Sequence, residues 1–155
     1  MEEIIIASCN LVLNGVKAFA EMKEKIKERL VKVYLEVCRN KTVLLKSGLL
    51  QTSVITRDDD TFIDTVKKLS NKEITPLYKF NKKRLFLPKG KKAIERRKNQ
   101  YALNYVVRQI NDLKIIAEGS RTKNAPAVRL SIRLKTLEKH LTVLENTLSP
   151  VGKKK

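Results

Sequence analysis

A row of leucines near the C-terminus constrains the fold more than any other feature of the sequence. The leucines recur at alternating steps of four and three residues, at Leu130, Leu134, Leu137, Leu141, Leu144 and Leu148. Side chains at this spacing lie on one side of an α-helix. The row therefore predicts a helix that opens near Pro126, because proline is favourable in a first turn, and that closes before Pro150.

A second apolar row precedes the first at the same kind of spacing, with Leu103, Val106, Ile110, Leu113 and Ala117. It predicts a helix over about residues 91–118 that ends at Gly119, since glycine commonly follows the last helical turn. The link "GSRTKNAPA" between the two rows is short. We therefore expect the two helices to form an antiparallel hairpin with coiled-coil-like packing.

The first part of the chain shows the same periodicity, with Ile26, Leu30 and Val33 in its apolar row. Opposite this row, the stretch "EMKEKIKER" alternates charges, which is typical of a solvated helix face. We predict one long amphipathic helix over residues 3–39. Within residues 42–56, we expect the helix to extend to residue 47. The residues that follow then form either an apolar linker or a short strand.

Three aspartates, Asp58, Asp59 and Asp60, precede the stretch "TFIDTVKKL". Carboxylates at a helix N-terminus accept hydrogen bonds from its first N–H groups, so we predict a short helix over residues 61–70. The alternative is that these aspartates bind a divalent cation together with Asp64. We favour capping, because it explains the cluster without a metal ion. Residues 71–90 contain two prolines and a glycine and are predicted as a connector, in which "LYKF" and "RLFL" pair as a small hairpin.

The composition agrees with a helical protein. Only five Gly and four Pro occur among 155 residues, which favours long helices over a sheet joined by many turns. The sequence thus predicts an all-α helical bundle with one long N-terminal helix, a short helix and a C-terminal antiparallel helical hairpin. Residues 1–150 form one domain that includes the basic connector 71–90, and residues 151–155 form a basic C-terminal tail. No pattern indicates a cofactor.

The net charge of +18 is concentrated in one segment. Residues 79–98, "KFNKKRLFLPKGKKAIERRK", contain ten Lys and Arg and one Glu, and their net charge of +9 is half of the total. A concentrated positive field attracts polyanions. We predict a nucleic-acid-binding protein, DNA- or RNA-binding, that contacts phosphates with little sequence preference in a packaging, ribonucleoprotein or accessory role. The expected contact residues are Lys79, Lys82, Lys83, Arg84, Lys89, Lys91, Lys92, Arg96, Arg97, Lys98, Arg121, Lys123, Arg129 and Arg133.

Aromatic residues accompany the first basic group. The rings of Tyr78, Phe80 and Phe86 have the chemistry to stack on unpaired bases, but we favour the interpretation that they anchor the connector to the bundle. The second basic group lies in the link and on the last helix, and it forms with the first either one long stripe or two separate patches. Its members are Arg121, Lys123, Arg129, Arg133, Lys135 and Lys139.

Arg133 and His140 are separated by six residues. This spacing resembles the motif of HEPN-type ribonucleases, in which an Arg and a His cooperate in metal-free cleavage at the RNA 2′-hydroxyl. The resemblance covers eight residues, and Leu134 stands where that family usually carries a polar residue. We favour the interpretation that both side chains are solvated residues beside the leucine row. The chain has one histidine, and we predict that it is not an enzyme, with a metal-free helical ribonuclease as the minor alternative.

Two other classes of function are alternatives. A helical oligomerisation or adaptor module would use the leucine row to form a homo-oligomer. A membrane-surface-active bundle would place the apolar run 4–16 on anionic lipid, although this run is too short and too polar to span a bilayer. Glu2 and Glu3 precede the run, where a secretory signal carries positive charge. We expect a cytoplasmic protein, with the nucleus, a virion or another nucleoprotein particle as alternatives.

Overall fold

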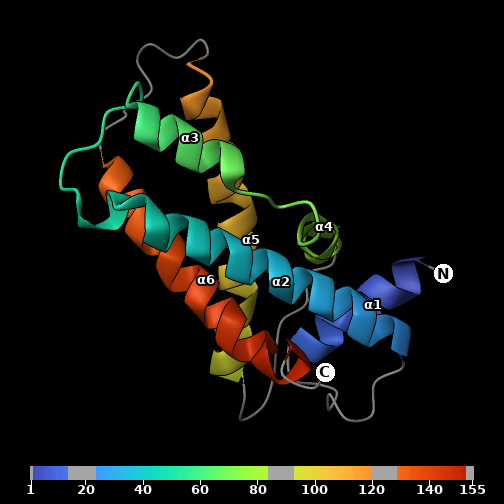
Figure 1. The fold of residues 1–155 in the computed structure, drawn as a ribbon. Helices are drawn as coiled ribbons and strands as arrows, with labels where there is room; N and C mark the ends of the chain where they lie inside the picture. The colour runs from blue at the N-terminus through green and yellow to red at the C-terminus, as the bar shows by residue number, and fades with distance from the viewer. Residues whose placement is uncertain (1, 14–23, 84–92, 120–128, 153–155) are drawn as a thin grey trace.

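The computed structural model describes residues 2–13, 24–83, 93–119 and 129–152. Across these ranges every regular element is helical: α1 (Glu2–Leu13), α2 (Glu24–Ser47), the 3₁₀ helix η2 (Leu49–Gln51), α3 (Asp60–Lys68), α4 (Thr75–Lys83), α5 (Ala93–Ala117) and α6 (Leu130–Gly152). The prediction of an all-α helical bundle is confirmed. In Figure 1, α2 and α6 lie side by side and α5 passes behind them, while α3 covers one end of α5 and α4 lies near α1.

The core lies between the three long helices. Each leucine of the predicted row on α6 is 1% exposed or less: Leu130, Leu134, Leu137, Leu141, Leu144 and Leu148. The facing row on α5 is buried from Leu103 to Leu113, and Ala117 at its end is partly buried. Helix α2 contributes Ile26, Leu30, Val33 and Val37. Burying apolar side chains of this size is the main term that stabilises a helical bundle. Because the leucine row packs inside its own chain, it is not available as the oligomerisation seam suggested by its sequence.

The predicted hairpin of α5 and α6 is antiparallel. The Thr147 hydroxyl near the end of α6 donates a hydrogen bond of 3.0 Å to Asn99 Oδ1 near the start of α5. Tyr105, further along α5, lies against His140, which is earlier on α6, with ring centroids 4.5 Å apart. At the end of α5, Gly119 adopts the expected left-handed conformation with φ of 66°.

The boundaries of α6 differ from the prediction at both ends. Arg129 has φ of 75°, so the helix begins after this residue and not near Pro126, which lies outside the described residues. At its other end, α6 continues through Pro150 to Gly152, although a stop before Pro150 was expected and residue 151 was assigned to the tail. Proline removes one N–H bond of the helix. The carbonyl that loses this bond, that of Asn146, accepts one from the Ser149 hydroxyl at 3.2 Å.

The N-terminal part of the chain forms two helices, so the prediction of one helix over residues 3–39 is wrong. Helix α1 ends at Leu13 and α2 begins at Glu24, and α1 folds back against α2. The Cys9 thiol donates to the carbonyl of Ile26 at 4.0 Å, whereas in one straight helix these residues would be about 26 Å apart. The apolar periodicity shows which side of a helix is buried, and it does not show where the chain reverses.

The end of α2 and the start of α3 follow the local signals. Helix α2 extends to Ser47, and Gly48 then takes φ of 77°, a conformation that favours glycine. Helix α3 begins after Asp59, whose carboxylate accepts hydrogen bonds from the N–H groups of Thr61 at 2.8 Å and Phe62 at 3.4 Å. The predicted capping role is confirmed for this aspartate.

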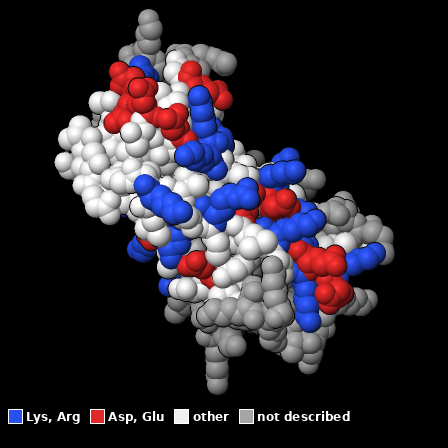
Figure 2. Space-filling view, viewed as in Figure 1, with Lys and Arg blue, Asp and Glu red and all other residues white. Residues whose placement is uncertain are grey.

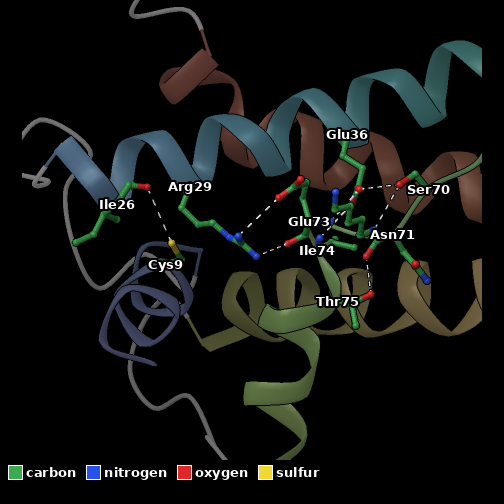
Figure 3. Close-up of polar contacts among 10 residues, drawn as sticks. Cys9, Ile26, Arg29, Glu36, Ser70, Asn71, Glu73, Ile74 and Thr75 are labelled. Atoms are coloured by element: carbon green, nitrogen blue, oxygen red, sulfur yellow. Dashed lines mark hydrogen bonds and ion pairs between the residues drawn. The ribbon is translucent and has the colours of Figure 1, made fainter. Parts of the chain in front are cut away.

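Residues 71–90 were predicted as a connector with a hairpin, and this is wrong for "LYKF", which lies in α4. Pro76 is in the first turn of α4, where its fixed φ suits a helix. The partner stretch "RLFL" lies outside the described residues. A carboxylate from α2 supports the start of α4: Glu36 accepts hydrogen bonds from the Ser70 hydroxyl and from the N–H groups of Glu73 and Ile74 at 2.9–3.0 Å (Figure 3).

Further contacts fasten the segment before α4 to α2. The Asn40 side chain exchanges two hydrogen bonds with the backbone of Ser70, at 2.7 and 2.9 Å. Arg29 donates to the carbonyl of Glu73 at 3.2 Å and forms an ion pair with its carboxylate at 3.6 Å. Burial raises the pKa of the Glu36 carboxyl, while its three donors oppose that shift. The position of α4 is thus set by residues distant in the sequence.

Candidate nucleic-acid interface

The predicted basic segment enters the bundle at the first turns of α5. Arg96, Arg97 and Lys98 belong to this helix, and the side chains of Arg97 and Lys98 are exposed. Because α5 and α6 are antiparallel, these turns lie beside the C-terminal half of α6, as the hydrogen bond between Thr147 and Asn99 shows. The structure therefore brings the end of the basic segment onto a rigid pair of helices.

A groove of about 550 Å³ opens where these two helices meet. We call it the α5–α6 groove, and its lining is Lys98, Asn99, Glu138, Lys139, Thr142, Val143, Asn146 and Thr147. Two ammonium groups, two amides and two hydroxyls thus share one concave surface with a single carboxylate. Lysine, amide and hydroxyl groups are the side chains with which proteins hold phosphate oxygens. The groove has the chemistry to accept a phosphate backbone.

An aromatic cluster lies beside the groove. Tyr101 is 61% exposed and contacts two other rings. Its centroid is 6.2 Å from that of Tyr105, with the planes inclined by 26°, and 5.2 Å from that of His140, with an edge-to-face angle of 61°. The rings come from both helices of the hairpin. Tyr101 therefore presents a large apolar surface to solvent from a supported position.

Burial controls the charge of this cluster. Desolvation lowers the pKa of His140, and the nearby charge of Lys139 lowers it further. The imidazole is therefore favoured in its neutral form near neutral pH. Burial also raises the pKa of the Tyr105 hydroxyl, an effect opposed by a hydrogen bond with Thr136 and by the charge of Arg133.

The two residues of the ribonuclease-like spacing both lie next to Tyr105. Arg133 acts on the Tyr105 hydroxyl through its charge, and His140 packs against the Tyr105 ring. Both side chains are half-buried, so they flank the leucine row, as expected, and are partly shielded from solvent. His140 Nδ1 is shielded from solvent and has no hydrogen-bond partner among the described residues. The geometry gives His140 a packing role between two tyrosines.

The other predicted contact residues are distributed over several elements. Lys79 is exposed on α4, Lys82 and Lys83 belong to the same helix, and Arg129 is exposed just before α6. Those outside the described residues are Arg84, Lys89, Lys91, Lys92, Arg121 and Lys123.

The two basic groups reach α6 at different positions. Arg129 precedes the first turn of this helix, whereas Arg97 and Lys98 lie near Thr147 at its other end. By helix rise, these two ends of α6 are about 26 Å apart. Between these two ends, Lys135 and Lys139 are exposed on α6, and Lys139 lines one groove with Lys98, so one stripe and two patches both stay possible arrangements.

The face formed by α2 has a different charge pattern. Figure 2 shows Lys and Arg side chains mixed with Asp and Glu along this face, and the acidic side chains gather over α3. Lys25, Lys32, Arg39 and Lys46 are exposed along α2, together with Glu24 and Glu28 near its start. A face with both signs is typical of a solvated helix, as the sequence predicted for "EMKEKIKER".

The sequence prediction missed the aromatic part of the site. It named Tyr78, which is half-buried and packs against the core, in agreement with the anchoring role favoured for it. It did not name Tyr101. The available signal was position, because Arg97 and Lys98 precede Tyr101 by four and three residues and so share its side of a helix. The contact with His140 depends on the packing of α6 and leaves no local signal.

Other classes of site find no support in the described part of the chain. Within these residues no group of three or more His, Cys, Asp or Glu side chains is arranged to hold a metal ion. None of the described helices is both long and apolar enough to cross a membrane. Comparisons with protein-family models, curated proteins and solved structures give no match to this chain.

Proposed function

We propose that this protein binds nucleic acid with little sequence preference, through phosphate contacts made by the α5–α6 groove and by the basic residues that precede it. The observation that carries the proposal is the shared groove of Lys98 and Lys139. Lys98 is an exposed member of the most basic segment of the chain, and Lys139 comes from another helix. Two cations on facing helices can hold successive phosphates of one backbone.

The global charge supports the same conclusion. The chain carries a net charge of +18, which raises the local concentration of polyanions and their rate of capture. On the face of α2 the cations are interspersed with carboxylates, and acidic side chains gather over α3 (Figure 2), whereas a single carboxylate, that of Glu138, lines the α5–α6 groove. Phosphate contacts release counterions, so affinity that depends on them falls steeply with salt.

The test is the salt dependence of binding to labelled oligonucleotides of random sequence. We expect a linear fall of log K with log salt concentration between about 50 and 200 mM. The double variant Arg97→Gln/Lys98→Gln should reduce this slope by about 1.4–1.8, since each neutralised phosphate contributes about 0.7–0.9. The triple variant Lys82→Gln/Lys83→Gln/Arg84→Gln should reduce it as well.

A matched control makes the test specific. The double variant Lys25→Gln/Lys32→Gln removes the same charge from the mixed face of α2 and should leave the slope nearly unchanged. A flat salt response of the unmodified protein would refute the proposal. An equal loss in the α2 control would show that net charge, and not the α5–α6 groove, determines binding.

Self-association has one supporting observation of its own. Val54 is 76% exposed and Ile132 is 55% exposed. The Ser131 hydroxyl donates to the carbonyl of Ser53 at 3.3 Å, which holds the loop that carries Val54 against the first turn of α6, where Ile132 lies. Figure 2 shows an area without charged side chains over the loop that follows α2. Light scattering of the protein and of Val54→Lys decides whether this patch forms an oligomer: a monomeric mass for both proteins excludes it.

A further inference from the structure

We propose that the α5–α6 surface binds single-stranded nucleic acid, with one base stacked on the ring of Tyr101 while Arg97, Lys98 and Lys139 hold the adjoining phosphates. The inference rests on the proposed function and adds to it a class of ligand and a mode of contact.

The exposure of Tyr101 is the first argument. An aromatic side chain that is 61% exposed leaves apolar surface in water, and this costs free energy that a stacked base would recover. The ring contacts two others, that of Tyr105 on the same helix and that of His140 on α6. Because these contacts already restrict its orientation, it loses less conformational freedom on stacking than an unsupported side chain would.

The placement of cations around the ring is the second argument. Arg97 and Lys98 are four and three residues before Tyr101, so the three side chains lie on one side of α5. Lys139 comes from the other helix: it lines the groove with Lys98, and its charge acts on His140, whose ring contacts Tyr101. A ring flanked by cations matches a nucleotide, which has a flat base and a charged phosphate.

The choice of single strands follows from the accessibility of bases. In a duplex each base is covered by its neighbours, and exposing one costs a few kcal/mol. In a single strand the base faces are accessible, and stacking on an aromatic side chain is tolerant of sequence. A contact through Tyr101 therefore favours single strands, whereas the lysines and arginines alone would bind either form.

The experiment uses Tyr101→Ala and Tyr101→Phe in the full chain, with single-stranded and duplex oligonucleotides of about 12 nucleotides. Tyr101→Ala should weaken single-strand binding by about 5-fold to 100-fold, the range that corresponds to the loss of one stacked base. Duplex binding should change by less than about twofold. Tyr101→Phe keeps the ring and should bind like the unmodified protein.

A spectroscopic readout tests the contact directly. The chain contains no Trp and four Tyr, so Tyr101→Trp places the only tryptophan at the proposed stacking position, and its emission can be excited selectively over that of the remaining tyrosines. We expect single-stranded oligothymidylate to quench its emission, and duplex DNA at the same phosphate concentration to quench it much less. Absence of quenching by the single strand would overturn the inference. This readout does not use Tyr101→Ala, so it applies even if that variant fails to fold.

The outcomes separate this inference from the proposed function. If Tyr101→Ala leaves single-strand affinity unchanged while Arg97→Gln/Lys98→Gln reduces the salt slope, stacking is overturned and phosphate binding stands. Equal losses for single-stranded and duplex ligands would also overturn stacking. If the unmodified protein binds neither ligand at any salt concentration, both proposals are overturned.

Discussion

Replacing Glu36 by glutamine should destabilise the protein measurably, because this carboxylate fills an acceptor role that an amide cannot. Oε2 accepts from the Ser70 hydroxyl at 3.0 Å and from the Glu73 N–H at 2.9 Å, while Oε1 accepts from the Ile74 N–H at 3.0 Å. Glutamine has one oxygen and one NH₂ group, and NH₂ only donates. The variant therefore leaves at least one N–H group facing another donor.

The magnitude follows from burial. Ile74 is 1% exposed, so its N–H group has no access to bulk water if the NH₂ group of the variant faces it. The opposite orientation leaves the part-buried N–H group of Glu73 without its acceptor. A buried donor without a partner costs about 1–3 kcal/mol. Against this, the glutamine variant avoids burying a charge, a cost visible in the raised pKa of the Glu36 carboxyl. We expect a net loss of about 1–2 kcal/mol in the free energy of unfolding, or about 2–8 °C in Tm for a chain of this length.

The assay is urea denaturation followed by circular dichroism at neutral pH, with Glu28→Gln as the control. Glu28 is an exposed residue of the same helix, and its substitution should change stability by no more than about 0.5 kcal/mol. The midpoint for Glu36→Gln should fall while the slope of the transition stays constant. A variant as stable as the unmodified protein would refute the reasoning. The stabilisation from the three hydrogen bonds would then be no larger than the free-energy cost of burying the carboxylate charge.

Three further predictions concern stability and titration. Asp59→Ala should cost about 1 kcal/mol through the lost cap of α3, and Asp64→Ala, in the same helix, should cost less when both are measured by denaturation. Lys41→Ala removes the 2.8 Å contact that lowers the pKa of Glu145 below 4.5. The Lys41→Ala variant should lose about 0.5–1 kcal/mol of stability near pH 7, and this loss should shrink as pH falls through the pKa of Glu145 in the folded protein. NMR titration of His140 should give a midpoint below 6.5, with stability decreasing as pH falls below that value because the unfolded chain takes up the proton first.

The periodic part of the fold was accessible from sequence because it depends on neighbours within one helix. The leucines of α6 were predicted as one buried side and are all buried. The short link between the two rows allowed only a hairpin, and the contact of Thr147 with Asn99 has the antiparallel order. Capping by Asp59 was equally local, since its acceptor and donors lie within three residues.

The errors arose where distant residues decide the structure. Helix α4 was predicted as part of a connector because Pro76, Pro88 and Gly90 occur in residues 71–90, and such residues usually mark turns and loops. Its start is supported by Glu36, which comes from another helix and meets the N–H groups of Glu73 and Ile74. The reversal between α1 and α2 also depends on residues distant in the sequence, as the contact of Cys9 with Ile26 shows. The apolar spacing is the same for one continuous helix and for two helices that pack against each other.

The candidate site shows a third kind of limit. Net charge identified residues 79–98 and defined their end at Lys98, where the run of cations stops. Helix α5 does not stop there, and its same side continues one turn later to Tyr101. A boundary set by charge therefore divides a surface that the helix makes continuous. Where a basic run ends inside a helix, the next turn on the same exposed side also belongs to the candidate surface. The reason is that the flat base of a nucleotide is attached close to the phosphate that the basic residues bind.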